Sequence, residues 1–543
     1  MMIDKQRISK CVLYEEMSEK DRIFWFEMKT KKFLHNIDTF YYSVKLQEDF
    51  TVESQDKTVL AFRHAVEKLN IRATKKAYTG DVVQLFVPEM NDYLNISNLK
   101  FSKYYNFSLG MPGAFDIFIA PIVPGNEVEV STTSEIIVQI RSEMLWLYGV
   151  TEAFEKSYAW VKAICQMYNL HIKEVKENRT DFCWHSNYLS EPEKFFDRKS
   201  MDEMRCTCLG HRTHYIFNDK GSNDSEFSYY SRGQKGQKVF LRIYNKSIEV
   251  IEEGYKSFFL KTWLFHNLIN RYDFDIYEQA YLRRSWKYVT IARLEYYVEH
   301  GKNEQYRQQC KHFILQYEQS GKVTDIMNAL ADKLTPPVTI IVNVEFQLMR
   351  KASKSYKILP IKNNTSKAEA KRIYDFLDNR KLIIDYLTDK TFRLVEKTGD
   401  SNKSRRPNCG FWTALRRTKL VDVAPTPVGL KMQRVYNRQL SAERMKKAII
   451  HKAVTYGMYM KGLNNDNPIS DAMLSLLCLN DNDIQEAKRY KAKRAKQLNK
   501  EMLEEVMPEE NYDHNYFLVD KLTGEYIDPE EEWMRENDLR RIL

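Results

Sequence analysis

The segment KVFLRIYNKSIEV, residues 238–250, contains the pattern on which the fold prediction depends. Apolar side chains recur at every second position, at Val239, Leu241 and Ile243. A period of two residues is typical of a strand that buries one face against a core. The segment therefore predicts a strand that ends close to Tyr244.

Tyr244 stands among charged residues. Arg242 and Lys246 lie two residues before and two residues after it, and Glu249 follows five residues after it. The tyrosine either ends an ordinary amphipathic strand or serves a chemical reaction. The remainder of the sequence has to distinguish these two interpretations.

The composition indicates a folded, cytoplasmic protein. Of the 543 residues, 43% are hydrophobic and 13% aromatic, which suffices for a sizeable core in two or three domains. The sequence lacks an apolar run long enough to cross a membrane, and its first residues lack the apolar core of a signal peptide. We therefore expect a cytoplasmic location and no membrane partner.

The basic charge lies outside the end of the chain. Residues 501–543 hold 14 acidic and 4 basic side chains, a net charge of −10, whereas the whole chain carries +10. The preceding residues therefore carry +20, and the segment 488–500 has seven basic residues among thirteen and no acidic residue. This charge favours a polyanion such as nucleic acid as the partner, although a lysine-rich solvated surface would give the same total.

Periodicity predicts strands and helices in mixed order. Strands are expected over 37–47, 81–89, 134–142, 171–189 and 287–301, with a strand–turn–strand unit over 226–246; helices are expected over 57–70, over 151–170 and from Ile248. Strands in adjacent pairs with helices between them favour an α+β domain on a mainly antiparallel sheet. Helical patterns dominate after residue 301, so a helical carboxy-terminal region is expected to follow.

Composition shifts suggest how the chain is divided. Polar or proline-containing stretches at 397–410 and 424–429 read as exposed loops or boundaries. The predicted parts are a lead segment, a catalytic domain, a helical region with an exposed basic loop, and a helical basic region with an acidic tail: 1–34, 35–300, 301–430 and 431–543.

Several common active sites are excluded, because the sequence contains no GxxxxGK[ST] loop, no HExxH and no GxSxG. Polar residues near the ends of predicted strands remain as candidates: Asp181, Tyr244, Glu249 and Glu295. Three carboxylates from separate segments suit Mg²⁺ or Mn²⁺, which take oxygen ligands. A tyrosine beside a metal and flanked by cations suits attack on a phosphodiester. Alternatively, all four are surface residues in salt bridges.

Three sequence blocks that contain these candidate residues resemble blocks of a known protein family. RTDFCWH, FLRIYNKSIE and RLEYYVE resemble the Rep_trans family, the trans-acting rolling-circle replication initiators of plasmids from Gram-positive bacteria, which includes relaxases of some integrative conjugative elements. The likeness covers about residues 35–300, and RIYNKxxE is its most specific part. It implies an HUH-like sheet, although the His-hydrophobic-His motif is absent from this sequence.

The resemblance implies roles for individual residues. Tyr244 would nick the DNA origin and become linked to its 5′ phosphate, with Arg242 and Lys246 as the catalytic cations beside it. The acidic positions that would hold the divalent metal are Asp181, Glu249 and Glu295. His185 stands where the family often has another acid, and it is a metal ligand, a hydrogen-bond partner or a structural residue. The basic residues expected to contact DNA are Arg179, Arg232, Lys235, Lys238 and Arg293.

The expected function is a metal-dependent DNA nickase and strand transferase that initiates rolling-circle replication. Its expected partners are double-stranded origin DNA with a hairpin, the nicked single strand, and a host helicase and polymerase; we also consider a homodimer. The same chemistry in a conjugative relaxase is one alternative. A DNA-binding relative that has lost catalysis is the other.

Overall fold

A computed structural model gives the fold of two compact units. It describes residues 31–48, 50, 54–79, 83–102, 104–120, 134–207, 213–218, 226–233, 238–253, 256–354, 356–359, 368–418, 433–434, 438–461 and 466–476, with 487, 489–490, 518–519 and 526–527. One unit comprises residues 1–352 and 361–425, and the other comprises residues 353–360 and 426–543. The expected boundary at residue 300 falls inside the first unit, and the basic segment 491–500 lies outside the described residues.

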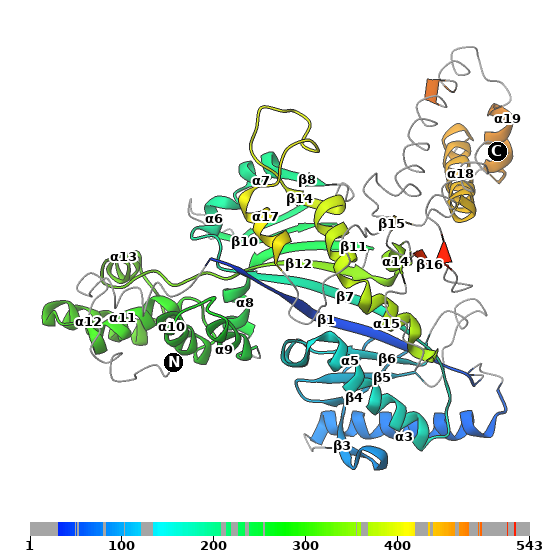
Figure 1. Ribbon diagram of the computed structural model, residues 1–543, viewed down its shortest axis with the longest axis horizontal. Helices are drawn as coiled ribbons and strands as arrows, with labels where there is room; N and C mark the ends of the chain where they lie inside the picture. The colour runs from blue at the N-terminus through cyan, green and yellow to red at the C-terminus, as the bar shows by residue number, and fades with distance from the viewer. Residues whose placement is uncertain are drawn as a thin grey trace. The chain divides into compact units, whose positions relative to one another are not determined.

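The first unit is built on an eleven-stranded sheet (Figure 1). All pairings between neighbouring strands are antiparallel, in the order β2-β3-β4-β5-β6-β1-β7-β12-β11-β10-β9. In this order the strands are Gln84–Val87, Asp92–Ser97, Ser108–Met111, Phe115–Ile119, Ile136–Ile140, Phe33–Leu46, Ile172–Ser186, Val342–Met349, Val239–Asn245, Glu226–Arg232 and Thr213–Asn218. The predicted α+β class with a mainly antiparallel sheet is therefore confirmed.

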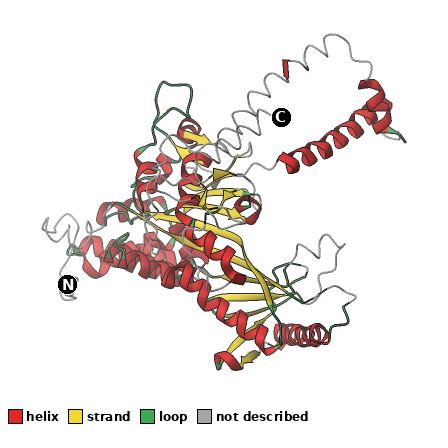
Figure 2. Cartoon of the chain, turned by 45° about the vertical axis from the view of Figure 1, so that its right-hand side comes forward, coloured by secondary structure: helices red, strands yellow, loops and turns green. Residues whose placement is uncertain are grey.

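One face of the sheet is apolar and is covered by helices (Figure 2). Tyr42 of β1 contacts Phe154 of α5 (Ser142–Met167), with ring centroids 5.0 Å apart. Phe40 of β1 lies 6.4 Å from Phe376 of α15 (Lys371–Asp378). Further along the sheet, Phe346 of β12 packs against Trp412 of α17 (Gly410–Arg417). Alternation along each strand sends the intervening side chains to the other face, which carries the polar residues.

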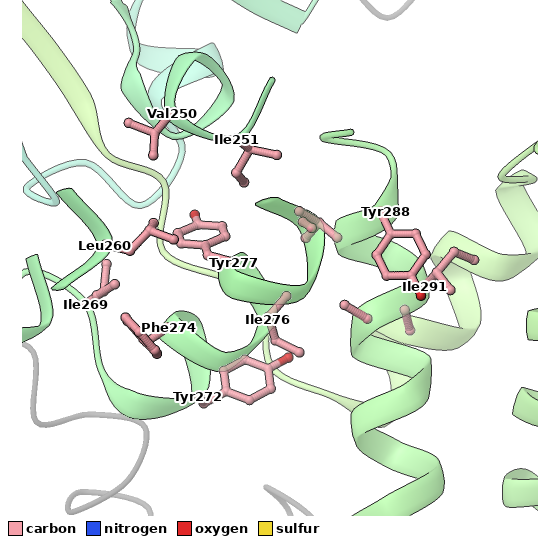
Figure 3. Packing of buried hydrophobic residues seen from close by; sticks show 14 of the residues in the cluster. Val250, Ile251, Leu260, Ile269, Tyr272, Phe274, Ile276, Tyr277, Tyr288 and Ile291 are labelled. Atoms are coloured by element: carbon pink, nitrogen blue, oxygen red, sulfur yellow. The ribbon is translucent and has the colours of Figure 1, made fainter. Parts of the chain in front are cut away.

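A helical insertion separates the adjacent strands β11 and β12. Its helices are α8 (Lys246–Glu253), α9 (Phe258–Phe265), α10 (Arg271–Leu282), α11 (Tyr288–His300), α12 (Glu304–Ser320) and α13 (Asp325–Leu334). Their apolar side chains form a core of their own, which includes Leu260, Tyr277 and Ile291 (Figure 3). At the base of the insertion, the Lys246 amide donates to the Ile341 carbonyl over 2.8 Å. The excursion therefore begins and ends at the same place on the sheet.

The strand predicted over 287–301 is wrong, because these residues form α11. Its buried residues include Tyr288, Ile291, Ala292 and Leu294, whose separations include three and four residues. Many of its residues are aromatic or β-branched, which favours a strand, but the apolar spacing of three and four residues favours a helix and prevails. The strand between β7 and β11 in the sheet is β12, and the sequence analysis placed its residues within a helical region.

Further elements of the first unit include α3 (Lys57–Thr79), α6 (Pro192–Phe195), α7 (Arg198–Met204), α16 (Arg380–Tyr386), β8 (Arg205–Thr207) and β14 (Phe392–Leu394). The second unit contains α18 (Arg438–Lys461) and α19 (Pro468–Leu476), in agreement with the predicted helical carboxy-terminal region. Among the described residues, no helix is long and apolar enough to cross a membrane.

Gly149 breaks α5 and generates the first prediction. Its backbone has φ 74° and ψ 163°, a conformation that is essentially restricted to glycine. Gly149→Ala should therefore lower the free energy of unfolding by about 1–3 kcal/mol. The matched control is Leu147→Ala, which changes a side chain that is 69% exposed and should alter stability by less than about 0.5 kcal/mol. Urea unfolding of both variants measures the difference, and equal effects would refute the assigned backbone strain.

Candidate active site

Tyr244 lies at the end of β11 with its hydroxyl group fully hydrogen-bonded. It pairs in register with Asn343 of β12, and its side chain is buried. The hydroxyl donates to Glu345 Oε2 over 3.1 Å and accepts from Asn343 Nδ2 over 2.9 Å. It also accepts from Lys246 Nζ over 3.3 Å. One carboxylate therefore faces the phenolic proton, while two donors face the oxygen lone pairs.

Lys246 is an ammonium group with no exposed surface. Its Nζ lies 2.5 Å from Glu249 Oε2 and 3.7 Å from Asp38 Oδ2. Although burial alone would lower its pKa, Tyr244, Asp38 and Glu249 together raise it well above the ordinary lysine value. Burial alone would likewise raise the pKa of Glu249, but Lys246 and Lys256 lower it to about 2. The lysine is therefore charged and held between two carboxylates.

His185 lies beside this ion cluster but is neutral. Burial, together with the positive charge of Lys246, lowers its pKa to about 3. Its Nδ1 accepts a hydrogen bond from Trp263 Nε1 over 3.1 Å, and its ring stacks on Trp146 at 4.9 Å between centroids. The same Trp146 donates to Asp38 Oδ1 over 3.1 Å. His185 is thus packed between the sheet and α9 as an aromatic side chain.

Two arginine–carboxylate pairs adjoin Tyr244 on neighbouring strands. Arg179 Nε donates to Asp181 Oδ1 over 2.9 Å on β7, and Arg242 of β11 pairs with Glu345 of β12. Burial raises the pKa of Asp181 to about 6; Arg179 opposes this shift and the negative charge of Glu345 adds to it. The two carboxylates therefore lie close enough to repel each other, and each is compensated by a guanidinium group.

The structure separates Glu295 and Arg293 from the tyrosine. Both belong to α11 in the helical insertion, where Glu295 Oε1 accepts from the Tyr288 hydroxyl over 2.6 Å. Arg293 is buried and binds Thr335, Asp332 and the Ala331 carbonyl at the end of α13. The guanidinium group expected to contact DNA is therefore engaged inside the protein.

The other residues predicted to contact DNA differ in their exposure to solvent. Arg179 and Lys238 are partly exposed, and Arg232 at the end of β10 is buried. Lys235 lies outside the described residues. Of these residues, Arg179 donates a hydrogen bond to Asp181, beside the tyrosine site.

Glu345, Asn343 and Asp38 are site residues that the sequence analysis missed. A signal for the first two was available, because Val342, Val344, Phe346 and Leu348 alternate with polar residues as a half-buried strand requires. Asp38 lies within the predicted strand 37–47, but nothing in its local sequence distinguishes it from a surface residue. Its partner Lys246 is identified only by the pairing of β1, β7, β12 and β11.

The predicted metal ligands are not brought together as a set. Within the described ranges, no three histidine, cysteine, aspartate or glutamate side chains are grouped as a metal site requires. Glu249 is bound to two lysines, and Glu295 lies in the insertion. Magnesium, however, is usually held by one or two carboxylates together with phosphate oxygens and water. The mutually repelling carboxylates of Asp181 and Glu345 fit that smaller requirement.

Two other tyrosines lie near Tyr244 on β10. Tyr229 pairs with Tyr244 in register, and Tyr230 pairs with Ile243. Tyr230 is fully buried on the apolar side, with its ring 6.1 Å from Phe392. Burial also raises its pKa, which disfavours its phenolate form. Tyr230 is therefore poorly placed to act as a nucleophile.

Comparison with known proteins gives limited information. No family model and no curated protein matches the chain. Among solved structures, a rolling circle replication initiator protein from Geobacillus stearothermophilus aligns with a TM-score of 0.31 and 10% sequence identity, over 71% of this chain and 95% of that chain. A similarity of this size does not establish a family, so the function has to be argued from the site.

The buried Lys246 generates a stability prediction. Lys246→Met should lower the free energy of unfolding by about 3–5 kcal/mol near neutral pH, because it leaves Asp38 and Glu249 without their closest cation. Glu249 has a folded-state pKa below its ordinary value of 4.5, so its contribution is complete above pH 4.5 and is lost as the pH falls toward 2. The difference between the two proteins should therefore shrink over this range.

Urea unfolding at a series of pH values measures this difference. Lys261→Met, which replaces an exposed lysine of α9, is the control and should have little effect at any pH. A deficit for Lys246→Met that stays constant between pH 7 and pH 3 would show that lost packing, rather than the ion cluster, causes the instability.

Proposed function

We propose that the protein is a DNA nickase and strand transferase that uses Tyr244 as its nucleophile and starts rolling-circle replication. The observation that carries this proposal is the environment of the tyrosine hydroxyl, with Glu345 as its proton acceptor and Asn343 and Lys246 as donors to its oxygen. A tyrosine with a purely structural role does not require a buried ammonium, a buried amide and a buried carboxylate on one oxygen atom.

The chemistry follows from these contacts. Burial raises the pKa of Tyr244 well above 10, so the free phenolate is scarce and the proton has to leave as the attack proceeds. Glu345 accepts that proton, and the released electron pair of the oxygen forms a bond to phosphorus. Lys246 and Asn343 stabilise the negative charge that develops on the oxygen before the bond is complete.

The products are a phosphotyrosine ester and a free hydroxyl. The bond from phosphorus to the 3′ oxygen breaks, and that oxygen takes a proton from water, while the 5′ phosphate remains on Tyr244. Arg242 and Arg179 are the cations next to the expected position of the phosphate, so they would bind its non-bridging oxygens. Since one phosphoester replaces another, the step is reversible, as strand transfer requires.

A divalent cation is part of this proposal. Asp181 and Glu345 are the carboxylates that would hold Mg²⁺ or Mn²⁺, in place of the ligand set expected from the sequence. When bound, the cation would neutralise charge on the phosphate. Glu345 would then share its two oxygens between this role and its contact with the tyrosine.

Sequence features support the wider biological setting. The block RIYNKSIE resembles the initiators of the Rep_trans family, and the described unit carries Tyr244 on an antiparallel sheet. The expected partners remain double-stranded origin DNA with a hairpin, the nicked strand, and a host helicase and polymerase, in the cytoplasm. A conjugative relaxase with the same chemistry is the second candidate, because the site contains nothing that distinguishes replication from transfer.

Tyr244→Phe tests the nucleophile. The variant should form no covalent adduct and should not nick supercoiled DNA, because it lacks the attacking oxygen, whereas DNA affinity should remain close to that of the unaltered protein. Tyr230→Phe is the matched control and should retain activity. Denaturing gel electrophoresis of the protein with a labelled oligonucleotide detects the adduct, and an adduct in the phenylalanine variant would transfer the role to another tyrosine.

Glu345→Gln and Glu295→Gln test which of the two glutamates takes part in the reaction: the one beside Tyr244 in the structure or the one expected from the sequence. Loss of the proton acceptor should slow nicking by about 100- to 10,000-fold, while the change on α11 should have little effect. Nicking should also stop in excess chelator and return with Mg²⁺ or Mn²⁺. Full activity in the chelator would refute the proposed cation, and equal loss in both variants would refute the assignment of Glu345.

A further inference from the structure

The face of the sheet that carries Tyr244 continues across four adjacent strands. Residues that pair directly across antiparallel strands project to the same face. Arg242 pairs with Glu345, Gln347 of the same strand pairs with Asp181, and Arg179 of β7 pairs with Tyr41 of β1. Alternation within each strand therefore places Tyr41 on the same face as Tyr244. Tyr244 is in register with His185 through Asn343, and His185 lies six residues from Arg179 on β7, so three strand spacings and six residues along the strands separate the two tyrosines by roughly 25 Å.

This face carries aromatic side chains that reach solvent. Phe101, in the loop after β3, is 40% exposed, and its ring centroid lies 5.8 Å from that of Tyr41. Phe101 is supported from below by Phe118 at 5.5 Å and from the side by Tyr105 at 5.7 Å. The Tyr105 hydroxyl donates to the Ser134 carbonyl, which fixes the supporting ring. The exposed ring is thus held in place.

Arg179 connects these rings to the tyrosine site. Its guanidinium carbon lies 5.5 Å from the centroid of the Tyr41 ring, while its Nε donates to Asp181. A guanidinium group over an aromatic ring, next to a second exposed ring, presents both charge and flat apolar surface. The contacts that α5 and α15 make with Tyr42 and Phe40 lie on the opposite face of β1, and Tyr41 itself is half-buried.

We propose that Tyr41 and Phe101, with Arg179 beside them, form a stacking platform for the bases of single-stranded DNA that extends from Tyr244. This inference rests on the proposed function. Single-stranded nucleic acid binds where aromatic rings stack with bases next to cations that contact the backbone. A span of roughly 25 Å corresponds to about seven stacked nucleotides. The platform would therefore hold the strand several nucleotides away from the scissile phosphate, without selecting particular bases.

The platform is tested with single-stranded oligonucleotides that carry 2-aminopurine at one position each. A base stacked on an aromatic ring loses fluorescence, so quenching should be strongest at one or two positions about seven nucleotides from the nick. Tyr41→Ala and Phe101→Ala should each weaken binding roughly 5- to 150-fold and restore the fluorescence at those positions. Tyr41→Phe, which retains the ring, should behave like the unaltered protein.

Phe265→Ala is the matched control, because it removes a phenylalanine that is 81% exposed on α9, in the helical insertion and not in the strands or the loop of the platform. It should leave affinity and fluorescence unchanged. Thermal unfolding confirms that each variant is folded. If the unaltered protein forms the covalent adduct but neither alanine variant changes affinity or quenching, the platform is refuted and the nickase stands. If no adduct forms with the unaltered protein, the proposed function fails, and the binding data still decide whether this face binds single strands.

Discussion

A lysine ammonium group without access to water is the constraint on which the site depends. Lys246 contacts Asp38 from β1, Glu249 from its own helix and the hydroxyl of Tyr244. Removing a charge from water costs several kcal/mol, so the lysine is stable there only while these oxygens remain close. Tyr244 and Glu249 lie within three residues of Lys246 in the sequence, whereas Asp38 comes from β1, more than 200 residues away. The pairing of β1, β7, β12 and β11 is therefore a requirement for the tyrosine environment as well as for the core.

The helical insertion does not disturb the positions of Tyr244 and Lys246, because both of its ends are fixed at one point of the sheet. The chain leaves the sheet after Asn245 and returns at Val342, and these two residues are paired with each other. The Lys246 amide and the Ser247 hydroxyl both hydrogen-bond to Ile341 at that junction. The entropic cost of closing a loop rises only slowly with its length, so a long excursion disturbs the two strands little. The insertion contributes Trp263 to the site through its contact with His185.

The sequence predicts the parts of the fold in which local pattern and tertiary environment agree. The strands around 37–47, 171–189 and 226–246 and the helix over 57–70 are confirmed, because their apolar periods match the faces that they bury. It fails at 287–301, where aromatic and β-branched composition opposed helical spacing. That error also placed the third acid on Glu295, although Glu345 occurs in a strand with clear alternation. Asp38 could not be identified, because its partner is distant in sequence and is defined only by the strand order.

The charges around Tyr244 explain why a cation belongs in the proposal. The described ionised groups there are four acids and four bases: Asp38, Asp181, Glu249 and Glu345, with Arg179, Arg242, Lys246 and Lys256. These charges cancel, and His185 adds none because burial keeps it neutral. A phosphodiester that enters this site brings one further negative charge into a region largely screened from water, where such a charge is costly. A divalent ion held between Asp181 and Glu345 would compensate for it without separating any of the existing ion pairs of Lys246.

The acids on that side of the tyrosine are bound to arginines, whose extended guanidinium groups have donors left to share with a phosphate. In the proposed mechanism, the lysine side of the tyrosine would therefore stabilise the nucleophile, and the arginine side would receive the substrate.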